Sequence, residues 1–79
     1  DAGKGMLFVF PEKGNYGIWM KDMLIPIDIV WLADDFTVLE SVVSVATSTY
    51  PQLFYPPEPV RYILELPGGT YQKGQPLPF

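Results

Sequence analysis

Short apolar runs separated by turn-forming residues dominate the first part of the chain. Residues 6–10 form a continuous apolar run that Pro11 closes, and such a run predicts a strand covered on both faces. Residues 11–15 have the composition of a turn. Residues 16–20 predict a second short strand, with Trp19 near its end. Together these segments predict a β-hairpin.

The middle of the chain contains the clearest pattern. Residues 27–32 (Ile-Asp-Ile-Val-Trp-Leu) predict a third strand, and residues 33–36 supply an acidic turn. Residues 37–45 predict a fourth strand, because Val and Thr favour a pleated strand over a helix. A fifth strand is predicted over residues 61–66, and Pro-Gly-Gly at residues 67–69 ends it.

The segment 46–59 interrupts this alternation. It contains four prolines and three aromatic residues: Pro51, Pro56, Pro57, Pro59, Tyr50, Phe54 and Tyr55. So many prolines exclude a regular ladder, so we expect a long packed loop. The tail 77–79 could add at most an edge segment. We therefore predict one mainly β domain over residues 1–79, a small antiparallel β-sandwich or barrel-like domain with a long Pro/Tyr-rich loop.

Composition supports a folded chain with a thin core. The chain has 79 residues, of which 48% are hydrophobic and 15% aromatic, well above the content of a disordered segment. It contains no cysteine and no histidine, so neither a disulfide nor a structural zinc is expected. The absence of histidine also excludes a serine–histidine mechanism. We predict no cofactor and no metal site.

Charge narrows the range of partners. Nine acidic and five basic residues give a net charge of −4, which would repel nucleic acid. No apolar stretch approaches the roughly 18 residues that a membrane-spanning helix needs, so the sequence predicts a chain that does not span a membrane. Because residue 1 is Asp rather than Met, we expect a processed chain or a piece of a longer one.

Four blocks in a fixed order carry a family resemblance. The blocks are Gly5-Met6-Leu7-Phe8, residues 19–28 (Trp-Met-Lys-Asp-Met-Leu-Ile-Pro-Ile-Asp), Tyr50-Pro51 with Tyr55-Pro56-Pro57, and residues 64–69 (Leu-Glu-Leu-Pro-Gly-Gly). In this order, and across nearly the whole chain, they resemble the domain-of-unknown-function 192 (DUF192) family. The resemblance implies a β-sandwich or barrel-like fold, an exported or periplasmic bacterial or archaeal protein, and no established activity.

The chain departs from the family pattern at both ends. Family members usually carry an additional upstream segment, resembling a strand and a short helix, and a longer stretch after the final glycine. Without the upstream strand, the sheet would either leave an edge exposed or fill it from another molecule. A homo-oligomer is therefore one expectation.

Two carboxylates in the second block are candidates for chemistry. Asp22 and Asp28 lie six residues apart across a turn that contains Pro26, and Lys21 lies beside them. Such a pair could bind a hard divalent cation or act as acid and base. Alternatively, Asp22 caps the turn and Asp28 accepts hydrogen bonds from the backbone or from Lys21. The apolar neighbours of Asp28 imply that its carboxyl group needs a partner.

Aromatic residues offer a second kind of site. Five of them could form a platform on which a sugar ring or a peptide stacks: Trp19, Tyr50, Phe54, Tyr55 and Tyr62. They could equally fill the core, which we expect for Trp19 and Tyr62, whereas Tyr50 and Tyr55 fit either role. The candidate binding residues are Trp19, Lys21, Asp22, Asp28, Tyr50 and Tyr55.

Three functions are consistent with these features. A non-catalytic accessory module would bind an unknown small molecule or protein at the 19–28 turn and the 46–59 loop, and it requires no residue that the chain lacks. A carboxylate-based hydrolase or lyase would use Asp22 and Asp28, with Lys21 and Glu65 assisting. A structural subunit of a homo-oligomer would instead place the proline-rich loop at an interface. We favour the binding module.

Overall fold

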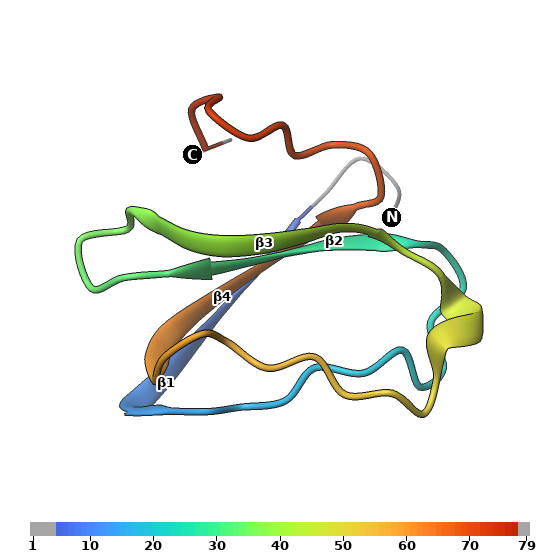
Figure 1. Ribbon diagram of the computed structural model, residues 1–79, viewed down its shortest axis with the longest axis horizontal. Coiled ribbons are helices and arrows are strands. Elements are labelled where there is room, and N and C mark those ends of the chain that lie inside the picture. The colour runs from blue at the N-terminus through green and yellow to red at the C-terminus, as the bar shows by residue number, and fades with distance from the viewer. Residues whose placement is uncertain (1–4, 78–79) are drawn as a thin grey trace.

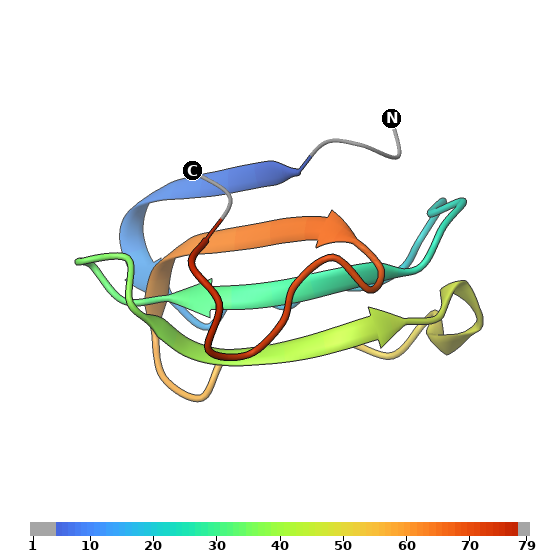
Figure 2. The same ribbon diagram turned by 90° about the horizontal axis from the view of Figure 1, so that it is seen from above.

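A computed structural model describes residues 5–77, and these form one four-stranded antiparallel sheet. The elements are β1 (Met6–Gly14), β2 (Ile27–Leu32), β3 (Val38–Val45), the short 3-10 helix η1 (Thr47–Thr49) and β4 (Val60–Pro67). The strand order across the sheet is β1-β4-β2-β3 (Figure 2). The predicted mainly β, antiparallel fold is confirmed. Within residues 5–77, no helix has the length and apolar character needed to cross a membrane.

β2 lies inside the sheet, and all six of its residues are buried. It pairs with β3 on one side and with β4 on the other. Ile27, Ile29 and Trp31 point to one face of the sheet, which we call the first face, where they pack in one core cluster. Val30 and Leu32 point to the opposite, second face and belong to another cluster. A strand buried on both faces explains the unbroken apolar character of this segment.

Two segments without strand structure cover the first face (Figure 1). They are residues 15–26 and residues 46–59, and they lie side by side below the sheet. Ile18 and Phe54 join them, because each backbone N–H donates to the other residue's carbonyl oxygen, at 2.9 and 2.8 Å. Met20, which is fully buried, anchors the first segment in the core.

The C-terminal segment covers the second face, above the sheet in Figure 1. Tyr71 is buried against Leu64 and Leu66 of β4, and Leu77 packs on the same cluster. The predicted edge segment at the tail is not a strand at Leu77, and its other two residues lie outside the described part of the chain.

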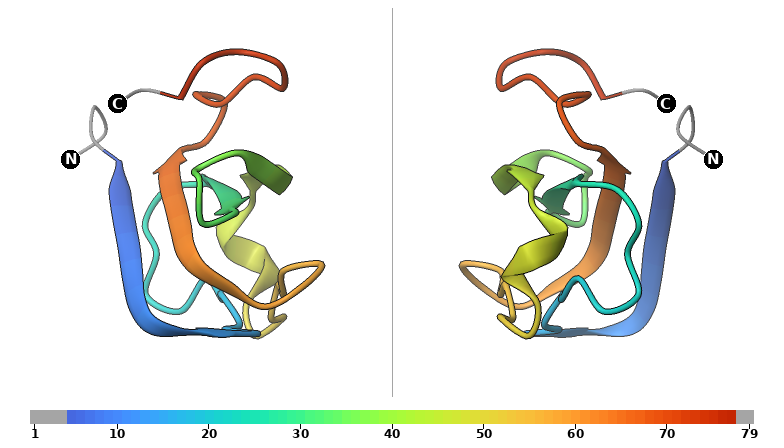
Figure 3. Two further views of the ribbon diagram at one scale, coloured as in Figure 1. Left: turned by 90° about the vertical axis from the view of Figure 1, so that its left-hand side faces the viewer. Right: turned by 90° about the vertical axis from the view of Figure 1, so that its right-hand side faces the viewer.

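β1 is longer than predicted and has a different partner. It continues through Pro11 and pairs with β4 rather than with residues 16–20. Pro11 is tolerated because β1 is an edge strand, and the pairing register shifts between Val9 and Gly14. Figure 3 shows the strand bending sharply at this end. The predicted hairpin of residues 6–20 is therefore wrong.

Residues 16–20 do not form the predicted strand. Their side chains alternate as in a strand, since Tyr16, Ile18 and Met20 pack against the first face while Trp19 is exposed. Apart from the Ile18 bridge, however, no neighbouring backbone pairs with the segment in the described residues. The predicted strands at 27–32, 37–45 and 61–66 correspond to β2, β3 and β4.

Candidate functional site

A tight turn leads from the core to the surface after Met20. The backbone N–H of Met23 donates to the carbonyl oxygen of Met20 at 3.1 Å, which closes a four-residue turn. Asp22, at the third position of this turn, has a φ of 60°, in the left-handed region. Asp tolerates this region better than most side chains. Asp22 is therefore the conformationally special residue of the turn, and the next residues continue as a loop to β2.

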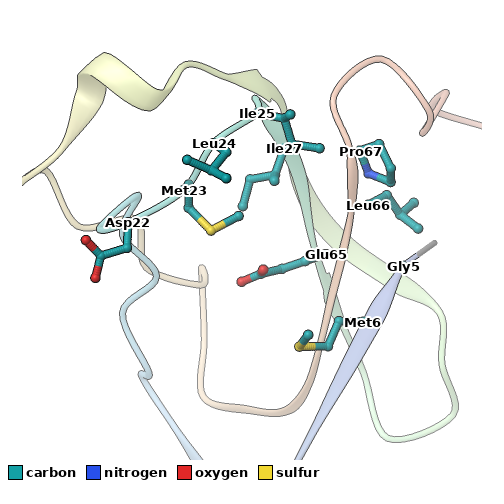
Figure 4. Close-up of a pocket in the computed structure, with 10 residues that line it drawn as sticks. All are labelled: Gly5, Met6, Asp22, Met23, Leu24, Ile25, Ile27, Glu65, Leu66 and Pro67. Atoms are coloured by element: carbon teal, nitrogen blue, oxygen red, sulfur yellow. The ribbon is translucent and has the colours of Figure 1, made fainter. Parts of the chain in front are cut away.

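A pocket of about 480 Å³ lies between this loop and the adjoining ends of β1, β2 and β4 (Figure 4). Most of its wall is apolar, and it contains the thioether side chains of two methionines. The lining residues are Gly5, Met6, Asp22, Met23, Leu24, Ile25, Ile27, Glu65, Leu66 and Pro67. The pocket thus combines three strand ends with a loop whose position is fixed by the buried Met20 on one side and by β2 on the other.

Glu65 is the polar group that points into this pocket (Figure 4). It lies on β4 opposite Met6 of β1 and Ile29 of β2, so strands flank it on both sides. Burial raises the pKa of the Glu65 carboxyl group above its ordinary value. Within residues 5–77, no hydrogen bond or ion pair compensates for this burial. The Glu65 carboxyl is therefore a partly buried group that no side chain in the described chain neutralises.

Asp22 lines the opposite side of the pocket, and its carboxyl group points away from Glu65 (Figure 4). No lysine or arginine is among the lining residues of the described chain, so both ionisable groups of the pocket are acidic. The pocket therefore favours cations over anions.

Asp28 has a structural position instead. Its side chain is 0% exposed and lies on the second face, away from the pocket. Oδ1 accepts the backbone N–H groups of Ser44 at 2.7 Å and Gly69 at 3.1 Å, and Oδ2 accepts that of Tyr71 at 2.7 Å. The interpretation of Asp28 as an acceptor of backbone hydrogen bonds is confirmed. The fold does not bring Asp28 together with Asp22, because Asp22 lines the pocket and the buried Asp28 does not.

Three of the predicted binding residues meet on the surface. The rings of Trp19 and Tyr50 lie 5.2 Å apart between centroids and are tilted by 50°, and the Nζ of Lys21 is 5.7 Å from the Trp19 ring centroid. Trp19 is 42% exposed and Tyr50 44%. The prediction that Trp19 fills the core is wrong, because the adjacent Met20 takes the inward position. We call Trp19, Lys21 and Tyr50 the aromatic cluster.

The remaining aromatic candidates lie elsewhere. Tyr55 is exposed, and its ring covers Gly17, where an added Cβ atom would come within 2.9 Å of the ring. Tyr62 packs in part against the core of the second face, in agreement with the expectation that it contributes to the core, and it contacts Phe36. Among residues 5–77, no group of three or more acidic, histidine or cysteine side chains could hold a metal ion.

Comparison with protein families adds one finding. The model of the DUF192 family, described as "Uncharacterized ACR", matches residues 1–75 of the 79-residue chain. The chain belongs to the DUF192 family. The resemblance carried by the four sequence blocks is thereby confirmed. A search of curated proteins and a search of solved structures both found no match.

Membership in DUF192 supplies no activity, so the function of this DUF192 domain has to be inferred from its geometry. The residue that sequence reasoning undervalued is Glu65, which was considered only as an assisting acid or base. A signal was present, because Glu65 lies between Leu64 and Leu66 and, by the strand period, shares a face with the buried Ile63. A charged residue at an inward position of a strand indicates either a partner or a site.

Proposed function

We propose that this DUF192 domain is a non-catalytic binding module for small molecules, with the pocket beside Glu65 as its site. The observation that carries the proposal is the combination of a largely apolar pocket of about 480 Å³ with one partly buried carboxyl group directed into it. Ligand sites in proteins typically have volumes of about 300–1,000 Å³, apolar walls and a few polar groups that orient the ligand.

The arrangement of the carboxyl groups supports binding rather than catalysis. A hydrolase or lyase built on Asp22 and Asp28 would need both groups to reach one substrate. Asp28 is 0% exposed, and both of its oxygens accept backbone hydrogen bonds. Asp22 and Glu65 lie across the pocket from one another, with the Asp22 carboxyl group pointing away from Glu65 (Figure 4). Neither pair is placed to share a substrate as acid and base.

A fragment screen followed by NMR tests this proposal. We expect some fragments to shift the backbone amide signals of Met23, Ile25 and Leu66, which line the pocket. The substitution Met6→Trp should abolish these shifts, because the larger ring would fill the pocket from β1. Met6 is already 58% exposed, so the fold should tolerate the change.

Val9→Trp is the matched control for Met6→Trp. Val9 lies on the same strand, is 59% exposed and does not line the pocket. Fragment binding should survive in the Val9→Trp variant. A screen without any binder would overturn the proposal, as would binders that are retained in the Met6→Trp variant, because they would occupy another site.

A second candidate function is sugar binding at the aromatic cluster. Its support is the exposed contact between Trp19 and Tyr50 with the Lys21 ammonium group beside it, since a sugar ring can stack on aromatic faces while the ammonium group donates to its hydroxyls. Titration with soluble oligosaccharides should shift the Trp19 indole signal, and Tyr50→Ala should weaken binding. Phe36→Ala, which removes an exposed ring at the β2–β3 turn, is the control. Equal loss in both variants would count against this candidate.

A further inference from the structure

The charge of the pocket indicates which ligands it selects. Both ionisable side chains in its wall, Glu65 and Asp22, are acidic, and no basic side chain of the described residues lines it. The whole chain also carries a net charge of −4. An anionic ligand would meet repulsion from the wall and from the surrounding field, whereas a cation would be attracted by both.

Glu65 provides a specific position for that cation. Its carboxyl group lies between β1 and the 20–27 loop, lacks a hydrogen-bond or ion-pair partner within residues 5–77, and has a pKa that burial raises. An ammonium group would supply the missing partner, and hydrogen bonds between ionised groups are about twice as strong as neutral ones. The ligand's charge is thus expected next to β4.

The rest of the pocket wall is apolar and suits the uncharged part of a ligand. Met6 and Met23 contribute flexible thioether side chains, and Leu24 and Ile25 contribute branched aliphatic ones. Methionine sulfur atoms make favourable contacts with aromatic rings and adapt to irregular shapes. An aromatic or branched aliphatic group would therefore find complementary surface here.

We propose that the pocket binds a small apolar primary amine, with the ammonium group on Glu65 and the apolar body between the two methionines and the loop. This assignment rests on the proposed function, because it names the chemical class of ligand for the same pocket.

Three probe molecules that share a phenylethyl group but differ in charge test the proposal that the pocket binds an amine. They are 2-phenylethylamine, 2-phenylethanol and 3-phenylpropionate, and each is titrated at neutral pH while the pocket amide signals are followed by NMR. Molecules this small bind in about the millimolar range. We expect the amine to bind about tenfold more tightly than the alcohol, because an ion pair replaces a neutral contact. The carboxylate should bind most weakly.

Two variants test whether Glu65 is the residue that recognises the charge of the amine. Glu65→Gln keeps the side chain's shape but removes its charge, so the amine should lose about tenfold in affinity and become similar to the alcohol. Glu40→Gln on β3 makes the same change outside the pocket and should leave the tenfold preference unchanged.

The outcomes separate this assignment from the proposed function. If the alcohol or the carboxylate binds as tightly as the amine, and Met6→Trp blocks that binding, the pocket binds ligands but the assigned class is wrong. The assignment is also wrong if the amine preference persists in Glu65→Gln, or if none of the three probes binds while other fragments do. If no fragment of any class binds, the proposed function itself fails.

Discussion

At the scale of single residues, Asp28 joins segments that are far apart in the sequence. It lies on β2 and accepts hydrogen bonds from Ser44 of β3 and from Gly69 and Tyr71 of the C-terminal segment. A buried N–H group that loses its acceptor costs about 1–3 kcal/mol. The Asp28 carboxyl group therefore helps to hold the C-terminal segment on the second face, together with the packing of Tyr71.

We expect Asp28→Asn to lower the free energy of unfolding by about 2 kcal/mol, because the amide can replace one oxygen but presents its NH₂ group to the donors of the other. Asp28→Ala should cost more, because it leaves three N–H groups without an acceptor. Urea denaturation measures the loss, and amide hydrogen exchange at Tyr71 should accelerate. A loss below about 0.5 kcal/mol in the Asn variant would contradict this role.

Asp22 allows a second prediction at this scale, since its φ of 60° is unfavourable for a residue with a Cβ atom. We expect Asp22→Gly to match or exceed the wild-type stability, and Asp22→Asn to remain close to it. Asp22→Ala should be about 1 kcal/mol less stable than the Gly variant, because Ala gains nothing from a short polar side chain in this conformation. Thermal unfolding of the three variants gives the order, and an Ala variant as stable as the Gly variant would contradict it.

The sequence predicted the environment of individual residues only in part. The apolar neighbours of Asp28 indicated that it would be buried with a partner, and the structure confirms this. The core position expected for Trp19 was wrong because Trp19 and Met20 are both apolar and adjacent, and composition alone does not decide which of the two points inward. The strand period indicated an inward position for Glu65, but its place in a pocket depends on β1 and β2, the strands that flank β4.

At the scale of elements, segments without strand structure cover both faces of the sheet. On the second face, Tyr71 closes a cluster formed by Val30, Leu32, Leu64 and Leu66. In so small a domain, one buried aromatic side chain is a large fraction of the core.

We expect Tyr71→Ala to lower the free energy of unfolding by about 3 kcal/mol, as for other large-to-small substitutions of buried aromatic residues. Tyr71→Phe is the control, because it keeps the ring, and the structure gives the Tyr71 hydroxyl no hydrogen bond within residues 5–77. Chemical denaturation should show a large loss for Ala and a change within about 0.5 kcal/mol for Phe. Similar losses in both variants would mean that the hydroxyl group, rather than packing, matters.

Local patterns explain which elements the sequence predicted. The β2–β3 hairpin was predictable because its strands are neighbours and its acidic turn lies between them. The pairing of β1 with β4 joins distant segments, and nothing in either segment alone specifies the partner. Residues 16–20 alternate like a strand because one side packs on a core, and this alternation arises whether or not the backbone joins a sheet.

At the scale of the whole molecule, two features concern partners. β1 is an edge strand, and Met6 and Val9 on it are largely exposed. The expectation of self-association therefore stays a prediction. Within residues 5–77 no strand pairs with the outer edge of β1, which is one candidate location, and a light-scattering mass that rises with concentration would support self-association. The pocket is the other feature, and its desolvated carboxyl group also affects how the stability of the whole domain depends on pH.

The pH dependence follows from the direction of the Glu65 shift. Its pKa is raised in the folded state, so between its ordinary value of about 4.5 and the raised value the folded chain binds more protons than the unfolded chain. The contribution of Glu65 to stability is complete below the ordinary pKa, falls as pH rises through this window, and is constant above the folded-state pKa. Asp35 contributes to the pH dependence of stability with the opposite sign, because hydrogen bonds from Thr37 lower its pKa.

We therefore expect Glu65→Gln to gain stability relative to the wild type as pH rises from about 4 to 7. The difference between the two proteins isolates Glu65, because Asp35 and the other carboxyl groups are common to both. Urea denaturation at several pH values gives the difference curve. A flat curve for Glu65→Gln would mean that water reaches the Glu65 carboxyl group freely. The pocket would then lack the desolvated group on which amine recognition depends.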